Sequence, residues 1–177
     1  MSQQQAPNSL NEKHLTAYDR MLERVQTAIH DLDVATGLRL HQAIDAAADK
    51  ALELGELTRE EADRIATYLK RDIEDAANYI AGPEAQEFKD WLKFDIERIE
   101  NELAEMFLSV ADQTAVDLAK LATQAQFPNT YHTGEITGVG TLICGHCGQA
   151  VHFYKTGHIP PCPKCKNTVF AREGSPE

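Results

Sequence analysis

All four cysteines of the chain lie in its last third, in two pairs of equal spacing. The first pair is Cys144 and Cys147, the second is Cys162 and Cys165, and fourteen residues separate the pairs. Two residues between paired cysteines let both sulfur atoms face one side of a tight turn, here called a knuckle. Two knuckles can therefore surround one tetrahedral ion. The pattern predicts a structural Zn²⁺ site with these four cysteines as ligands.

Iron and disulfides are the alternatives to zinc. Iron also accepts four thiolates in a tetrahedral arrangement, and four cysteines can instead be buried thiols or disulfides. No signal peptide is recognised in the sequence, and cysteines of proteins that are not exported are more often metal ligands than disulfides. His146, between the first two cysteines, is an alternative ligand, but the four sulfurs are better spaced and leave it facing solvent. A closed four-sulfur shell has no open position for a substrate water, so the ion is expected to be structural and not catalytic.

Other groups with chemical potential are weaker candidates. Three further histidines lie in the same part of the chain and suggest either a second metal site or ordinary surface residues, of which we favour the latter: His132, His152 and His158. Acidic clusters on the predicted helices are expected to be solvated faces: Glu60, Glu61, Asp72, Glu74 and Asp75. No nucleotide-binding glycine loop, GxSxG elbow or HExxH motif is present. No catalytic residues are therefore predicted.

The residues before the cysteines have the apolar spacing of helices that pack lengthwise. The first predicted seam, from a helix starting near Ser9, is Leu15, Tyr18, Leu22, Val25, Ile29 and Leu32. The second is Leu40, Ile44, Ala47, Ala51 and Leu54. The third is Ala62, Ile65, Leu69, Ile73, Ala76 and Ile80, and a fourth, longer helix is expected over 92–121.

Turn and capping residues separate these helices. Gly37 predicts a break after the first seam, because glycine in a helix interior costs about 1 kcal/mol. Gly55 suits the C-terminal cap of the second helix. Thr58 and Glu61 form a capping box, in which each side chain bonds the other residue's amide at a helix start. Gly82-Pro83 is expected to end the third helix.

The cysteine region has the composition of a small β-structure. Strands are predicted over 141–143, 151–154 and 168–170, so the segment reads as a three-stranded zinc ribbon. The expected fold is mainly α: an antiparallel helical bundle or coiled-coil hairpin over 1–127, then a β zinc ribbon over 128–177 with a disordered tail after Arg172. Pro128 marks the hinge, and the two regions are expected to share little buried surface.

The charge is concentrated in the helical region. The chain has a formal charge of −11. Residues 1–127 contain 25 acidic and 13 basic side chains, a balance of −12, whereas residues 128–177 have a balance of +1. Such a charge favours a basic protein partner over nucleic acid. No apolar run spans a membrane and no signal peptide is recognised, so a cytoplasmic location without membrane contact is expected.

The whole pattern resembles the YbeL-like family of bacterial zinc ribbon-containing proteins. The residues that carry the resemblance are Gly55-Glu-Leu-Thr-Arg59, Tyr131-His-Thr-Gly-Glu135, Gly138-Val-Gly140, Leu142 and the two cysteine pairs. The resemblance implies a cytoplasmic protein with a helical region and the four cysteines as metal ligands, and it implies no activity. Lys166 stands where a glycine is usual after the second knuckle.

These observations favour a non-enzymatic protein that uses its helices and its zinc ribbon for interaction with a macromolecule, and a protein partner is expected. The alternative is a nucleic-acid-binding or transcription-associated protein acting through Lys155, Lys164, Lys166 and His146. A redox enzyme is a third hypothesis, which requires metal-free thiols in the C-x2-C pairs. Self-association through the helical seams is also expected, because the helix over 92–121 exposes an apolar stripe unless a second copy covers it.

Overall fold

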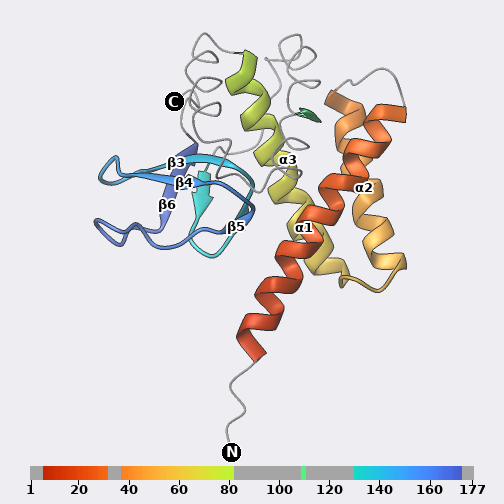
Figure 1. Ribbon diagram of the computed structural model, residues 1–177, viewed down its shortest axis with the longest axis horizontal. Helices are drawn as coiled ribbons and strands as arrows, with labels where there is room; N and C mark the ends of the chain where they lie inside the picture. The colour runs from red at the N-terminus through yellow and green to blue at the C-terminus, as the bar shows by residue number, and fades with distance from the viewer. Residues whose placement is uncertain (1–5, 32–36, 82–108, 111–129, 173–177) are drawn as a thin grey trace, which may run out of the picture.

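Three packed helices form the first part of the molecule. The computed structural model describes residues 6–31, 37–81, 109–110 and 130–172. The helices are α1 (Ala6–Asp31), α2 (Gly37–Glu53) and α3 (Arg59–Ala81). They run up, down and up again beside one another, as Figure 1 shows. The predicted antiparallel bundle is confirmed. The fourth helix expected over 92–121, the boundary at 127 and the tail after Arg172 lie outside the described residues, apart from Ser109 and Val110.

The seams predicted from apolar spacing make the bundle core. Their buried members include Tyr18, Leu22, Leu40, Ile44, Leu69 and Ile73. Val110 is buried in the same cluster. Leu54 is an exception: it is 56% exposed. Because α2 ends at Glu53, Leu54 falls in the turn that follows, and Leu57 takes the buried place.

Both predicted caps fix the turn between α2 and α3. Gly55 has a φ of 67°, and its N–H donates to the carbonyl of Leu52 at 3.0 Å. The N–H of Glu56 donates to the carbonyl of Ala51 at 2.9 Å, which completes a Schellman cap. Thr58 N–H donates to Glu61 Oε2 at 2.8 Å, and Glu61 N–H donates to Thr58 Oγ1 at 3.3 Å. The capping box is confirmed.

The ribbon has more strands than predicted. Within the described residues 130–172 there are six short strands: β1 (Thr130–His132), β2 (Ile136–Thr137), β3 (Gly140–Cys144), β4 (Ala150–Phe153), β5 (Gly157–His158) and β6 (Val169–Arg172). Antiparallel pairing gives a four-stranded sheet in the order β1-β6-β3-β4 and a two-stranded sheet of β2 and β5. The three predicted strands are β3, β4 and β6. The addition of β1 was missed, because a three-residue strand with one apolar side chain, Tyr131, has too little alternation to be recognised.

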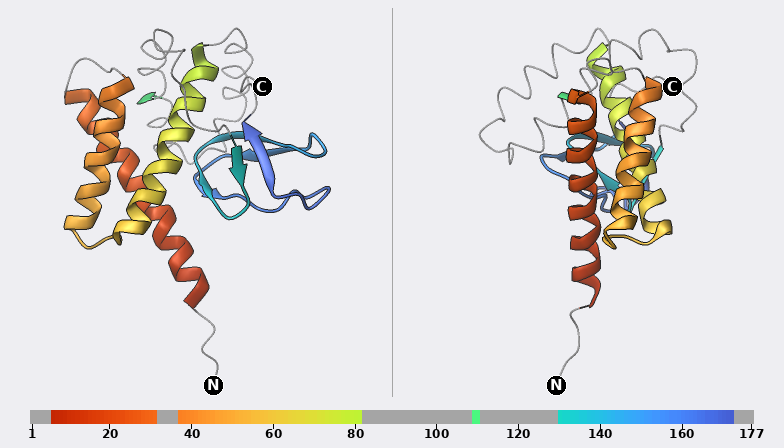
Figure 2. Two further views of the ribbon diagram at one scale, coloured as in Figure 1. Left: turned by 180° about the vertical axis from the view of Figure 1, so that it is seen from behind. Right: turned by 90° about the vertical axis from the view of Figure 1, so that its right-hand side faces the viewer.

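The expectation that the two regions share little buried surface is wrong. The ribbon lies against α3, on the side away from α2 (Figures 1 and 2). Ile136 and Val139, both from the ribbon, are buried in the same apolar cluster as the helical seams. The partly buried Tyr154 packs against this cluster as well. Part of the ribbon therefore belongs to the helical core, while the residues around Cys144, Cys162 and Phe170 form a second apolar cluster within the ribbon.

The packing of the ribbon also corrects the reading of the acidic residues on α3. Asp72, Glu74 and Asp75 were expected on a solvated face, but all three are buried. Helix α3 is covered on two sides, by α1 and α2 and by the ribbon, so residues outside its apolar seam are also enclosed. Glu60, which precedes this covered part, is exposed as predicted.

Candidate metal centre

Two knuckles with matching hydrogen bonds form the candidate metal centre. In the first, Gly148 N–H donates to the carbonyl of Cys144 at 3.0 Å, and Cys144 N–H donates to the carbonyl of Gln149 at 2.9 Å. In the second, Lys166 N–H donates to the carbonyl of Cys162 at 2.9 Å, and Cys162 N–H donates to the carbonyl of Asn167 at 2.9 Å. The same C-x2-C spacing therefore folds into the same turn twice.

The last residue of each knuckle has a left-handed backbone. Gly148 has a φ of 69° and Lys166 a φ of 64°. Lys166 is the one non-glycine residue with a positive φ among the described residues. Glycine adopts this conformation without strain, whereas a residue with a Cβ does so at a cost of roughly 1–2 kcal/mol. Lys166, which stands where a glycine is usual in the family, therefore adopts the same turn as Gly148 but with a strained backbone.

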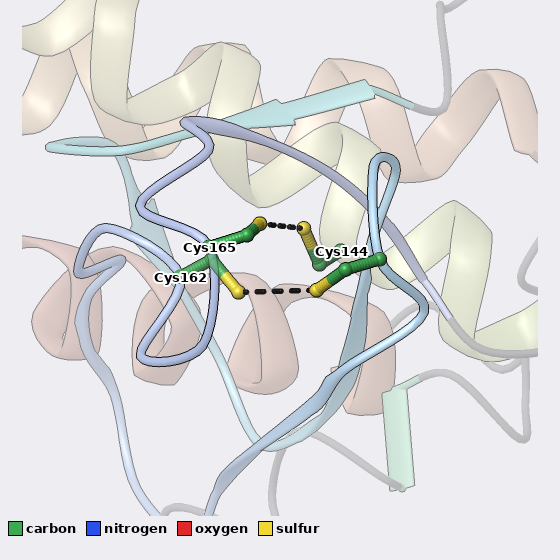
Figure 3. Close-up of side chains that lie close together, drawn as sticks. Cys144, Cys162 and Cys165 are labelled. Carbon is green, nitrogen blue, oxygen red and sulfur yellow. Dashed lines mark hydrogen bonds between the residues drawn. The ribbon is translucent and has the colours of Figure 1, made fainter.

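The knuckles bring the four predicted ligands together. Their Sγ atoms all lie within 4.8 Å of one another. Cys144 and Cys165 are 3.6 Å apart at Sγ, as are Cys147 and Cys162, so each short distance joins one knuckle to the other (Figure 3). All four thiols are free of disulfides. The alternative of two disulfides requires a much shorter separation of the paired sulfurs, of about 2.05 Å.

This arrangement fits a tetrahedral ion. Zn–S bonds of about 2.3 Å place neighbouring sulfurs of a regular tetrahedron about 3.8 Å apart, close to the 3.6 Å of the two cross-knuckle pairs. Cys144 and Cys162 are buried, whereas Cys147 and Cys165 are half-buried. A four-cysteine cluster of this kind is typical of a zinc ribbon.

The backbone of each knuckle favours thiolates. Burial opposes ionisation of Cys144, but the N–H groups of His146 and Cys147 outweigh it and lower the pKa of this thiol to about 6. Burial likewise opposes ionisation of Cys162, and the N–H groups of Cys165 and Lys164 lower its pKa. The first cysteine of each knuckle is thus prepared to act as an anionic ligand. For Cys165 the N–H of Asn167 also favours the thiolate, but burial and the neighbouring thiols raise its pKa to about 12.

The histidines near the ribbon do not form a second metal site. Among the described residues, the four cysteines are the only cluster of metal-ligating side chains. His146 is exposed, as predicted. The other three go to separate partners: His132 lies 3.4 Å from Glu135, His152 bonds Thr141 at 2.9 Å, and His158 bonds the carbonyl of Gly134 at 3.1 Å.

A buried polar network beside the metal centre was missed in the sequence. Tyr131 and Arg172 of the ribbon meet Arg71, Asp72 and Asp75 of α3. The Arg71 guanidinium lies 3.7 Å from the centre of the Tyr131 ring, and it bonds Glu135 Oε2 at 2.5 Å. The available signal was an Arg-Asp-x-x-Asp run beside the apolar seam of α3, but its partners in the ribbon lie 56 or more positions away.

The comparisons with known proteins agree with this geometry. The family model described as "Zinc-ribbon containing domain" matches residues 27–174. The chain is 26% identical to "Uncharacterized protein YbeL" of Escherichia coli K12 over 151 aligned residues. The alignment covers 85% of this chain and 87% of the relative. The proteins of the same name from Escherichia coli O6:H1 and O157:H7 match to the same extent. No solved structure matches the chain. None of the helices within the described ranges is long and apolar enough to cross a membrane.

Proposed function

The chain belongs to the zinc-ribbon containing domain family, and we propose that it is a non-enzymatic binding protein whose ribbon is held by one structural Zn²⁺. The four-sulfur cluster carries this proposal, since Cys144, Cys147, Cys162 and Cys165 supply a complete tetrahedral shell. Zinc is preferred because it accepts such a shell without a redox role. Iron is the alternative metal.

The internal pairing of the reactive groups argues against catalysis. A catalyst needs a nucleophile, a base or an open metal position facing a pocket. The buried carboxylates of α3 are already engaged inside the protein: Asp72 with Tyr18, Glu74 with His41 and Asp75 with Tyr131. A shell of four cysteines leaves no ligand position for substrate. The C-x2-C pairs are proposed to hold metal and not to exchange disulfides.

The surface charge supports a basic protein as the partner. Acidic side chains on the exposed faces of the helices include Glu12, Glu23, Asp45, Asp49, Glu53, Glu60 and Asp63. A negative surface attracts basic partners and repels phosphate backbones. The candidate residues for a nucleic-acid contact are all exposed on the ribbon: Lys155, Lys164, Lys166 and His146. Three lysines and one histidine are few for a phosphate-binding face, so we rank that function second.

A capture experiment tests the partner. Zinc-loaded protein is immobilised and exposed to extract from the native host, with and without nuclease. We expect a protein to be retained after nuclease treatment and to be released from the immobilised chain by salt. Retention of nucleic acid alone, lost in the Lys164→Glu, Lys166→Glu double variant, would reverse the ranking. Lys50→Glu is the matched control, because Lys50 is an exposed lysine of α2 away from the ribbon.

Self-association through the helices is the remaining part of the proposal. Leu10 of α1 and Leu54 beyond α2 are large apolar side chains that are more than half exposed. Light scattering over a range of protein concentrations tests it. A mass that rises with concentration is expected, and a constant monomer mass would contradict it.

A further inference from the structure

Strand β6 connects the metal centre to the helices over four residues. At its start, Gly145 N–H of the first knuckle donates to the carbonyl of Val169 at 3.0 Å. Asn167, two residues after the last cysteine, donates from Nδ2 to the same carbonyl at 3.1 Å. Both knuckles therefore hold the beginning of β6. The strand ends at Arg172, which lies against α3.

The guanidinium of Arg172 is bound on every side. Its Nη1 donates to the carbonyl of Val139 at 2.9 Å and its Nη2 to Thr137 Oγ1 at 3.0 Å. Its Nε donates to the hydroxyl of Tyr131 at 3.0 Å. Arg172 is 7% exposed. Gly140 leaves room for this side chain, because a Cβ at that position would lie 2.3 Å from Nη1.

Two carboxylates of α3, Asp72 and Asp75, lie within ion-pair distance of this arginine, although their shortest hydrogen bonds come from other residues. Asp72 Oδ1 lies 3.8 Å from Arg172 Nη2, and Asp75 Oδ2 lies 4.0 Å from Nε. Asp72 also accepts the N–H of Gly138 at 2.7 Å, another contact that comes from the ribbon. Within α3 itself, Arg71 is the nearby cation, at 3.4 Å from Asp72. Removal of one partner from a buried ion pair is strongly destabilising.

We propose that metal binding at the four cysteines sets the stability of α3, with Arg172 at the end of β6 as the residue that transmits it. The ribbon is too small to hold its strands without the ion. Loss of the ion releases the start of β6, and Arg172 then leaves Asp72 and Asp75. Ile136 and Val139 leave the helical core with it. Metal occupancy thereby becomes a switch that controls whether α3 is held in the folded bundle. This inference rests on the metal site of the proposed function.

Helical unfolding with and without metal tests the switch. The full chain is melted in its zinc-loaded form and after chelation under reducing conditions, and helicity is followed by far-UV circular dichroism. We expect chelation to lower the helical midpoint on the order of 5–10 °C. In Arg172→Met the zinc content should remain one per chain while the chelation-induced shift becomes clearly smaller, because only the loss of Ile136 and Val139 from the helical core still contributes to it. Arg64→Met, which removes an exposed arginine from α3, should keep the full shift.

Hydrogen exchange on the wild-type chain decides the question if Arg172→Met does not fold. Chelation should increase exchange in α3 around Asp72 and Asp75 more than in α2, which serves as the internal reference. A bound ion whose removal leaves the helical midpoint and α3 exchange unchanged would overturn the switch. So would an Arg172→Met variant that keeps the full shift. Absence of any metal in the wild-type protein would instead refute the metal site itself.

Discussion

The hydroxyl of Tyr131 donates a 2.6 Å hydrogen bond to Oδ2 of Asp75 and accepts one from Arg172 Nε at 3.0 Å. Tyr131 comes from β1 and Asp75 from α3, so this hydroxyl joins the ribbon to the helical bundle. Burial raises the pKa of the Asp75 carboxyl, while the hydrogen bond from Tyr131 and the charge of Arg172 oppose this rise. The carboxylate therefore depends on its ribbon partners to remain ionised inside the protein.

Tyr131→Phe should lower the free energy of unfolding by about 1–3 kcal/mol. The ring and its packing remain, but Asp75 loses its donor and Arg172 its acceptor. Chemical denaturation followed by circular dichroism measures the change. Tyr68→Phe is the control, because the Tyr68 hydroxyl has no hydrogen bond to any described residue, and it should change little. Equal stability of the two variants would show that the buried bond contributes nothing.

Lys166→Gly should stabilise the ribbon. It relieves a left-handed strain of roughly 1–2 kcal/mol, and the greater freedom of glycine in the unfolded chain offsets about 0.4–1 kcal/mol of that gain. Lys166→Ala removes the same charge but keeps the strained Cβ, so it should have no such benefit. Competition with a zinc chelator provides the measurement. Tighter zinc retention by Lys166→Ala than by Lys166→Gly would contradict the strain at this knuckle.

Acid should weaken the bundle partly through Glu61. Hydrogen bonds from His14 and from Thr58 N–H lower the pKa of this carboxyl to about 2, from 4.5. A depressed pKa gives a stabilisation that is complete above pH 4.5 and is lost as the pH falls toward 2. Glu61 is near the surface, so the effect is modest.

Glu61→Gln should flatten this part of the acid-unfolding curve, followed by helicity from pH 5 down to about 2. Glu60→Gln is the matched control: Glu60 is its exposed neighbour and takes no part in the cap. Acid also removes metal from thiolates, but it does so equally in both variants. Parallel curves for the two would exclude the capping box as the source of the acid sensitivity.

The elements that depend on local signals could be predicted from the sequence. The seams of α1, α2 and α3 follow from apolar spacing, and the turn between α2 and α3 follows from Gly55, Thr58 and Glu61. The metal site could be predicted from the paired spacing of the four cysteines alone, because each knuckle closes within five residues. For these parts, the residues that decide the structure are neighbours in the chain.

The contact between ribbon and helices could not be predicted, because it depends on pairs far apart in sequence. Asp75 reads as a surface residue until its partner Tyr131, 56 positions away, is known. A buried charge is compatible with the fold only once Arg172 is placed beside it. Pro128 and the glycines after it suggested a separate ribbon, and nothing local in Ile136 or Val139 shows that they complete the helical core.

The most direct test of the account is the coordination of the metal in protein purified without added zinc. Elemental analysis should find one zinc per chain, and X-ray absorption at the zinc edge should show four sulfur neighbours at about 2.3 Å. Cys162→Ser should lose most of the metal, whereas Lys164→Ser, a change to the same residue type within the same knuckle, should retain it. A shell containing nitrogen or a bound water, or metal-free protein with two disulfides, would contradict a closed structural zinc site.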